Sequence, residues 1–226
     1  MHRLVVVGES ESKYQEVCDF TRTIFMERTG VAYTGFPPSF VCCYQGEELQ
    51  GAIGISEGSK KNPLTAEKFH DFDLLARLSA GLENRRCLLG EMGTLSKSRQ
   101  STARVTIWVC AAAIIHSRSL GIKHLVFITN SVIKRMAGPL GLRLTILGRA
   151  DFGRCDAAMQ KAWASYSKYP LETIGIDTDQ GFDGSLAFLR SQAAEVDISD
   201  IINGRPYHGQ QAAGKIHRII EWGAAY

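Results

Sequence analysis

The sequence predicts an α/β (α+β) fold in which a mixed β-sheet carries helices on both faces. Short apolar runs rich in β-branched residues alternate with longer segments whose apolar residues recur at helical spacing. The length of 226 residues, with 45% hydrophobic and 22% charged residues, suits a globular chain that buries a core without disulfide bonds. The predicted order is strand, helix, two strands, helix, strand, helix, strand, helix, strand, helix, strand.

The first part of the chain is predicted to contain a strand, a helix and a β-hairpin. Residues 4–7 are a short apolar run typical of a strand. Over residues 12–28, apolar side chains recur every three or four positions and form one stripe along a helix, which Gly30 ends. The apolar runs 40–44 and 49–55 flank a polar turn, which is typical of a hairpin.

The middle of the chain has clear helical and strand patterns. Residues 62–82 are predicted to be helical, with an apolar stripe and Thr65 as a candidate N-cap. A strand follows over residues 85–95, and then a helix over residues 101–120 whose surface is largely apolar, which indicates packing against a sheet. Residues 123–130 are a nearly continuous apolar run, typical of a strand buried on both faces.

Helices and strands continue to alternate in the next segment. A short helix is predicted over residues 131–142, with Ser131 as its cap, followed by a strand over residues 143–151. A helix over residues 156–169 precedes the last predicted strand, residues 171–178.

The pattern weakens after this strand, which suggests a boundary near residue 180. We expect one domain over residues 1–180 and a C-terminal helical extension over residues 181–226 that packs on it. The helical segments predicted in the extension are residues 185–196 and 214–226.

Charge and composition argue against several classes of function. The net charge of +3 is small and forms no basic patch, so we expect no nucleic-acid partner. The apolar run at residues 4–7 is too short for a signal sequence or a membrane span, so we expect a cytoplasmic protein without a membrane partner. The cysteines form no CxxC pair and the histidines no HExxH motif, so we expect reduced core cysteines and no metal.

Three motifs, together with the order of the elements, resemble the GNAT acyltransferase superfamily. Within it they are most similar to the thermostable hemolysin family and, more distantly, to the acyl-homoserine-lactone synthases. The motifs are "GEMGTLS" at residues 90–96, the segment of residues 126–151, and "WASYSKYP" at residues 163–170. The resemblance spans roughly residues 22–178 and implies a GNAT-like, mostly antiparallel sheet with splayed central parallel strands.

The resemblance implies an acyl donor with a pantetheine arm. In the GNAT fold this arm enters between the splayed strands, and its pyrophosphate lies on the turn that begins the long helix, where unpaired amides bind anions. Here that turn, residues 96–104, has hydroxyl and basic side chains where glycines are usual. This favours either weak coenzyme A binding or a phosphopantetheine arm on an acyl carrier protein; a capped, solvated helix start is the alternative. The implied donor contacts are Met92, Gly93, Thr94, Leu95, Ser96, Lys97, Arg99, Gln100, Ser101 and Asn130.

Glu91 is the candidate base or water-positioning residue. Acyl transfer to an amine needs a proton acceptor and donors for the oxyanion, which the amides of residues 92–95 would supply. Burial of Glu91 at a strand end would raise its pKa toward that of a useful base. The alternative is a structural carboxylate. Its candidate partners are Arg85, Arg86 and Lys97.

Two further candidates have alternatives that are at least as common in proteins. Tyr166 would protonate the leaving thiolate, although aromatic side chains at helical spacing more often pack in a core. Asn130 would orient the pantetheine arm, although an Asn that follows a strand and precedes a helix is more often a helix cap.

The resemblance to the homoserine-lactone synthases is incomplete. Those enzymes have an N-terminal set of Arg, Phe and Trp residues that organises S-adenosylmethionine binding. This chain has Arg22, Phe25 and Arg28, but no Trp before Trp108. The chain also lacks an amphipathic insertion segment, so the family's hemolysin name does not predict membrane lysis.

We therefore expect an enzyme, an N-acyltransferase that moves an acyl group from acyl-CoA or an acyl carrier protein to the amine of a small molecule in specialised metabolism. Two alternatives stay open: a non-catalytic GNAT-fold binding or scaffold protein, and a homoserine-lactone-synthase-like enzyme that uses S-adenosylmethionine. The sequence leaves the oligomeric state open, with a homodimer among the options.

Overall fold

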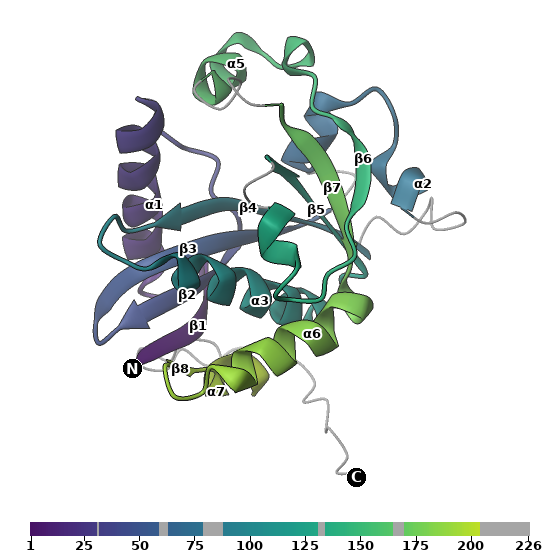
Figure 1. Cartoon of the computed structure of the whole chain (residues 1–226). Helices are drawn as coiled ribbons and strands as arrows, with labels where there is room; N and C mark the ends of the chain where they lie inside the picture. The colour runs from purple at the N-terminus through teal and green to yellow at the C-terminus, as the bar shows by residue number, and fades with distance from the viewer. Residues whose placement is uncertain (31, 59–62, 79–87, 131–133, 165–169, 204–226) are drawn as a thin grey trace.

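The computed structural model describes residues 1–30, 32–58, 63–78, 88–130, 134–164 and 170–203. Within these residues, eight strands form one mixed sheet in the order β6-β7-β5-β4-β3-β2-β1-β8. Figure 1 shows helices on both sides of this sheet. The predicted fold class is therefore confirmed.

The N-terminal strands form an antiparallel meander, made of β1 (His2–Gly8), β2 (Ser39–Gln45) and β3 (Glu48–Glu57). The hairpin between β2 and β3 turns at Gly46, whose φ of 62° is in the left-handed region that favours glycine. The predicted hairpin and first strand are both confirmed.

The helices α1 (Tyr14–Thr29) and α3 (Ala103–Ser119) cover opposite faces of these strands. Successive strand residues point to opposite faces, so Leu4 packs in the cluster that contains α3 residues and Val5 in the cluster that contains α1 residues. Gly30 ends α1 with a φ of 71° and its amide donates to the carbonyl of Met26, as the sequence predicts.

The parallel centre of the sheet consists of β4 (Leu89–Lys97) and β5 (His124–Thr129), which α3 connects. The two strands pair only at their beginnings, where Glu91 is the last β4 residue with a β5 partner. Beyond it, β4 stays paired with β3, and β5 stays paired with β7 (Glu172–Asp177), so the two parallel strands separate. The edge strand β6 (Thr145–Arg149) completes this half.

The segment after β7 belongs to the same sheet and core. The helix α6 (Thr178–Ser191) packs beside α3, and β8 (Val196–Asp197) pairs in parallel with β1. The short helix α7 (Ser199–Ile202) follows. The predicted boundary at residue 180 thus falls inside α6, which also begins earlier than the predicted helix 185–196. The other predicted C-terminal helix, 214–226, lies outside the described residues.

The prediction of one continuous helix over residues 62–82 is wrong. The described part of this segment contains a 3₁₀ helix, η1 (Thr65–Phe69), and a short α-helix, α2 (Leu74–Leu78). Leu64, and not Thr65, is the N-cap of η1. The first turn is anchored to the sheet, because the amides of Thr65 and Ala66 donate to the side chain of Glu91.

Two other predicted helices are shorter than expected. The described part of the helix predicted over residues 131–142 contains a 3₁₀ turn, η3 (Arg135–Ala137), and the expected cap Ser131 lies outside the described residues. The helix α5 (Ala157–Trp163) begins where Asp156 accepts a hydrogen bond from the amide of Met159. A 3₁₀ turn, η4 (Phe152–Arg154), precedes it.

None of the helices in the described part of the chain is both long and apolar enough to cross a membrane.

Candidate functional site

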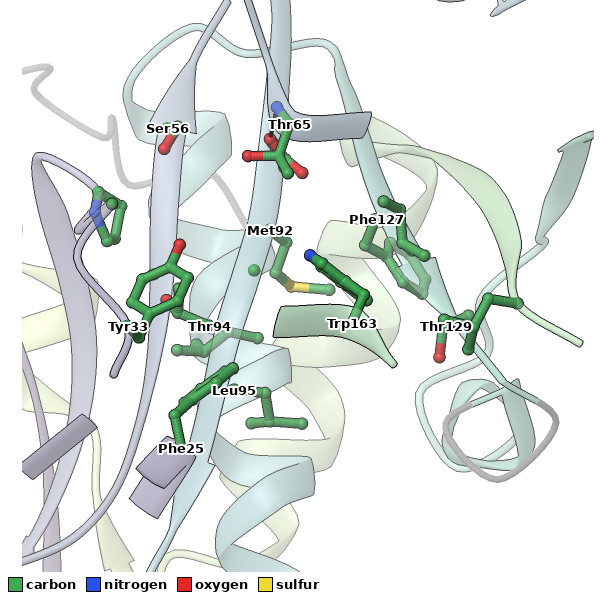
Figure 2. Close-up of a pocket in the computed structure, with 18 of the residues that line it drawn as sticks. Phe25, Tyr33, Ser56, Thr65, Met92, Thr94, Leu95, Phe127, Thr129 and Trp163 are labelled. Atoms are coloured by element: carbon green, nitrogen blue, oxygen red, sulfur yellow. Dashed lines mark hydrogen bonds between the residues drawn. The ribbon is translucent and has the colours of Figure 1, made fainter. Parts of the chain in front are cut away.

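A cavity of about 360 Å³ lies where β4 and β5 separate. Its walls come from α1, the loop before β2, β3, β4, η1, α3, β5 and α5. Figure 2 shows Phe25 and Tyr33 on one side of this cavity and Phe127 and Trp163 on the other. The separation of the two parallel strands thus opens a space that segments distant in the sequence enclose.

A bulge in β4 lies at the wall of this cavity. Gly54 pairs with Gly93 and Ala52 pairs with Ser96, so two β4 residues, Thr94 and its successor, lie opposite the single β3 residue between them. Thr94 has a φ of 49°, which is strained for a β-branched residue, and its buried hydroxyl has no partner among the described residues. The bulge therefore holds this part of β4 in a strained conformation beside the cavity.

The predicted donor contacts on β4 reach the cavity. Met92, Gly93, Thr94 and Leu95 all line it. Since the described residues give β4 no partner on its β5 side beyond Glu91, backbone groups on that side of the strand face the gap.

Glu91 is buried at the end of the parallel pairing and also lines the cavity. Its carboxylate oxygens accept hydrogen bonds from the amides of Thr65 at 2.5 Å and Ala66 at 3.1 Å. Burial raises the pKa of Glu91 to about 7, although the hydrogen bonds from these amides counteract the shift. Its observed partners are thus the amides of Thr65 and Ala66 and the Thr65 side chain. Arg85 and Arg86 lie outside the described residues, and Lys97 bonds elsewhere.

Tyr33 is a cavity residue that no sequence pattern indicates. It lies in the loop between α1 and β2, and its ring packs against Phe25 and Phe36 at centroid distances of 5.0 and 5.4 Å. Burial, and secondarily the negative charge of Glu91, raise the pKa of Tyr33, so its phenol stays neutral. Loop aromatics without a periodic pattern carry no sequence signal that distinguishes a site residue from a packing residue.

The predicted phosphate turn is closed around its own lysine. The ammonium of Lys97 donates to the carbonyl oxygens of Ser98 and Ser101, each at 2.7 Å. The amide of Ser98 donates to the carbonyl of Gln50, and the side chain of Ser101 accepts from Lys97 at 3.5 Å. These contacts stabilise the turn without a glycine.

The other polar residues of this turn also have partners away from the cavity. The exposed Arg99 forms an ion pair with Glu27 at 3.2 Å, and the amide of Gln100 donates to the hydroxyl of Ser98. Ser96 is buried and its hydroxyl lies 3.2 Å from that of Thr21. None of the predicted contacts from Ser96 to Ser101 lines the cavity.

Arg28 connects this turn to the cavity. Its guanidinium donates to the carbonyl of Lys97 at 3.3 Å, it is exposed, and it lines the cavity together with Phe25. Arg22, by contrast, lies outside the cavity, because it pairs with Asp19 and stacks over Phe36. Only part of the Arg22, Phe25 and Arg28 set is therefore at the cavity.

The remaining predicted site residues have different outcomes. Asn130 lines the cavity at the end of β5, and its carbonyl accepts a hydrogen bond from the amide of Lys134. Tyr166 lies outside the described residues. Trp163, from the same motif, lines the cavity and packs edge-on against Phe69.

Several apolar side chains line the cavity. They include Met92, Cys110, Phe127 and Leu171. Burial raises the pKa of the Cys110 thiol to about 12, so this thiol stays protonated and unreactive. Within the described residues, five cysteines are buried and free, and no cluster of His, Cys, Asp or Glu side chains could hold a metal ion. Cys87 lies outside the described residues.

Comparison with known protein families matches most of the chain to one family. Residues 7–181 match the family described as thermostable hemolysin. No curated protein matches the chain.

Several solved structures are similar to this chain, and two of those given below are named as acyl synthases. The acyl-homoserine lactone synthase BjaI, solved with SAM and isopentyl-CoA, has 15% identity and a TM-score of 0.58, covering 87% of this chain and 92% of its own. FeeM, an N-acyl amino acid synthase from uncultured soil microbes, has 14% identity and a TM-score of 0.55, covering 84% and 99%. TofI in its apo form has 15% identity and a TM-score of 0.54, covering 82% and 95%. At these identities the likeness shows the fold, which is GNAT-like.

Proposed function

The chain belongs to the thermostable hemolysin family and has a GNAT-like fold, and we propose that it is an N-acyltransferase. It would move an acyl group from an acyl thioester to the amine of a small molecule. The observation that carries this proposal is the environment of Glu91, a buried carboxylate that lines the cavity where β4 and β5 separate. The acyl-transferring activities named for BjaI and FeeM, which share the fold, support it.

Glu91 would take the proton of the attacking amine. A general base works best when its pKa lies near the working pH, and burial raises the pKa of Glu91 to about 7. Each carboxylate oxygen accepts one amide hydrogen bond, and the Thr65 side chain is a third partner, which leaves one of the four lone pairs for a proton or a water molecule. The two amides thereby fix the carboxylate in position without blocking it.

The neighbouring β4 segment would stabilise the oxyanion. Backbone amides placed before the reaction starts can stabilise developing negative charge. The strained bulge at Thr94 interrupts the regular ladder beside the cavity, and strain of this kind is frequent at active sites. The apolar side chains of Met92, Phe127 and Leu171 would bind the acyl chain.

The donor would carry a pantetheine arm, on coenzyme A or on an acyl carrier protein. Arg28 is the cation that reaches from the cavity to the predicted phosphate turn, so it would contact the donor phosphate. The turn offers no tight amide cradle, because the carbonyl oxygens of Ser98 and Ser101 hold the ammonium of Lys97, and residues 96–101 do not line the cavity. We therefore expect the diphosphate of coenzyme A to add little affinity.

The test is a screen for thioester consumption by the purified protein. Octanoyl-CoA, octanoyl-pantetheine and octanoylated acyl carrier protein would each be mixed with a pool of amino acids, polyamines and S-adenosylmethionine. We expect free thiol release and a new N-octanoyl product in mass spectra, at a rate reduced at least about tenfold in Glu91→Gln. Arg28→Ala should raise KM for the donor and leave the apparent KM for the acceptor unchanged. Thiol release that is no faster with the protein than without it, for every donor, would refute the proposal.

A specific observation favours a second function, a non-catalytic binding protein. Both carboxylate oxygens of Glu91 hold η1 amides, which is also what a purely structural carboxylate would do. In that case the protein would bind octanoyl-pantetheine, seen as a higher melting temperature, without consuming it.

A further inference from the structure

Tyr33 and Glu91 both line the cavity, although they come from distant parts of the chain, and they lie near enough for the charge of Glu91 to raise the pKa of Tyr33. Ser56 and Thr65 also line the cavity, and the amide of Thr65 donates to Glu91. Figure 2 shows the hydroxyl of Tyr33 directed into the cavity, toward the end where Ser56 and Thr65 lie. Within the part of the chain that the structure describes, the hydroxyl makes no hydrogen bond. It is therefore placed to contact a bound molecule.

The position of this hydroxyl is set by packing. The Tyr33 ring lies between Phe25, at a centroid distance of 5.0 Å, and Phe36, at 5.4 Å. The loop that carries it is tied to α1, because the hydroxyl of Tyr14 donates to the carbonyl of Pro37 at 2.8 Å. A side chain held in this way can orient a substrate group without losing much conformational freedom.

The neutral phenol can act as both donor and acceptor. Burial and the nearby charge of Glu91 raise the pKa of Tyr33, so the hydroxyl keeps its proton across the physiological range. A neutral hydroxyl does not compete with Glu91 for the amine's proton. It can accept a hydrogen bond from one N–H while Glu91 accepts another.

On the basis of the proposed function, we propose that Tyr33 is a further catalytic residue, whose hydroxyl orients the acceptor amine beside Glu91. The amine nitrogen attacks the thioester carbonyl carbon, an N–C bond forms, and the C–S bond breaks with its electron pair on sulfur. The amine's proton passes to the carboxylate of Glu91 and from there to the thiolate. Tyr33 accepts a hydrogen bond from the remaining N–H and neither gains nor loses a proton.

This role predicts that Tyr33 affects attack by an amine but not attack by water. Octanoyl-pantetheine and hydroxylamine are the probes, because hydroxylamine is small enough to enter any amine site. The ratio of octanoyl hydroxamate to free octanoate, measured by mass spectrometry, reports the partition between amine and water. The reaction without protein is subtracted from both products. In Tyr33→Phe, which keeps the ring packing, we expect the protein-dependent ratio to fall at least about tenfold.

The matched control is Tyr14→Phe, which removes a hydroxyl that stabilises the same loop outside the cavity. Its ratio should equal that of the wild-type protein. An unchanged ratio in Tyr33→Phe, or an equal fall in both variants, would overturn the role of Tyr33 while leaving the acyltransferase proposal intact. Absence of any enzyme-dependent hydroxamate or octanoate in the wild-type protein would instead overturn the proposed function, and this inference with it.

Discussion

At the residue scale, the site depends on one carboxyl group, and burial disfavours its ionised form. Glu91 is 9% exposed, and only two backbone amides and the Thr65 side chain offset the loss of hydration. The pKa of Glu91 is about 7 instead of its ordinary value of 4.5. The same residue is thus an anchor for η1 and a candidate base.

This pKa predicts how stability depends on pH. Between about pH 4.5 and pH 7 the folded state binds more protons at Glu91 than the unfolded state does, so stability falls as the pH rises through this window. From urea denaturation at pH 5 and pH 8, we expect the free energy of unfolding to decrease by on the order of 3 kcal/mol from this group.

Glu91→Gln is the matched variant, because its amide does not titrate. The part of the slope that is due to Glu91 should disappear, although one of the amides of Thr65 and Ala66 then loses its acceptor. Acyl transfer by the wild-type protein should change in the opposite direction and rise through about pH 7, since the ionised form is the base. Equal stability slopes in both proteins would contradict the raised pKa.

At the element scale, the β3–β4 pair determines the shape of the cavity wall. Where β4 bulges at Thr94, β3 contributes Gly54, and a side chain at this position would collide with its surroundings. A Cβ atom on Gly54 would lie 2.2 Å from Cγ of Pro37 and 2.4 Å from Oγ1 of Thr94. The bulge, the glycine and the loop before β2 therefore form one packed unit.

Gly54→Ala should consequently destabilise the fold. Either the Pro37 loop or the bulge would have to move, and we expect a loss of about 1–3 kcal/mol in the free energy of unfolding, measured by urea denaturation. Gly93→Ala is the control in the paired position, because a Cβ atom there meets no other atom within 4 Å. A loss in Gly93→Ala as large as that in Gly54→Ala would show that sheet propensity, and not this contact, sets the cost.

At the scale of the whole molecule, the segment after β7 completes the sheet and the core. The pairing of β8 with β1 joins the two ends of the described chain, and Leu189 of α6 is fully buried in the cluster that contains α3. Figure 1 shows α6 and α7 along the same side of the sheet as α3. The division into a domain of residues 1–180 and an extension stays a prediction.

Leu189→Ala tests how strongly α6 contributes to the fold. If α6 is part of the same cooperative unit, the cavity left by this substitution should cost about 2–5 kcal/mol in a single unfolding transition. Ile202→Ala, at a position that is 41% exposed on α7, should change stability by about 0.5 kcal/mol or less. A separate early transition in Leu189→Ala would show that the extension unfolds independently.

The sequence by itself determined the element order, the hairpin, the long apolar helix and the glycine that ends α1, because these depend on periodicity and backbone preferences of neighbouring residues. It also identified Glu91 and the β4 segment beside it. Only the tertiary structure decided what these residues contact. Glu91 binds an amide 26 positions away, β1 pairs with β8 from the other end of the described chain, and Tyr33 reaches the cavity from a loop. Local patterns carry no information about such contacts, since they arise only when packing brings distant segments together.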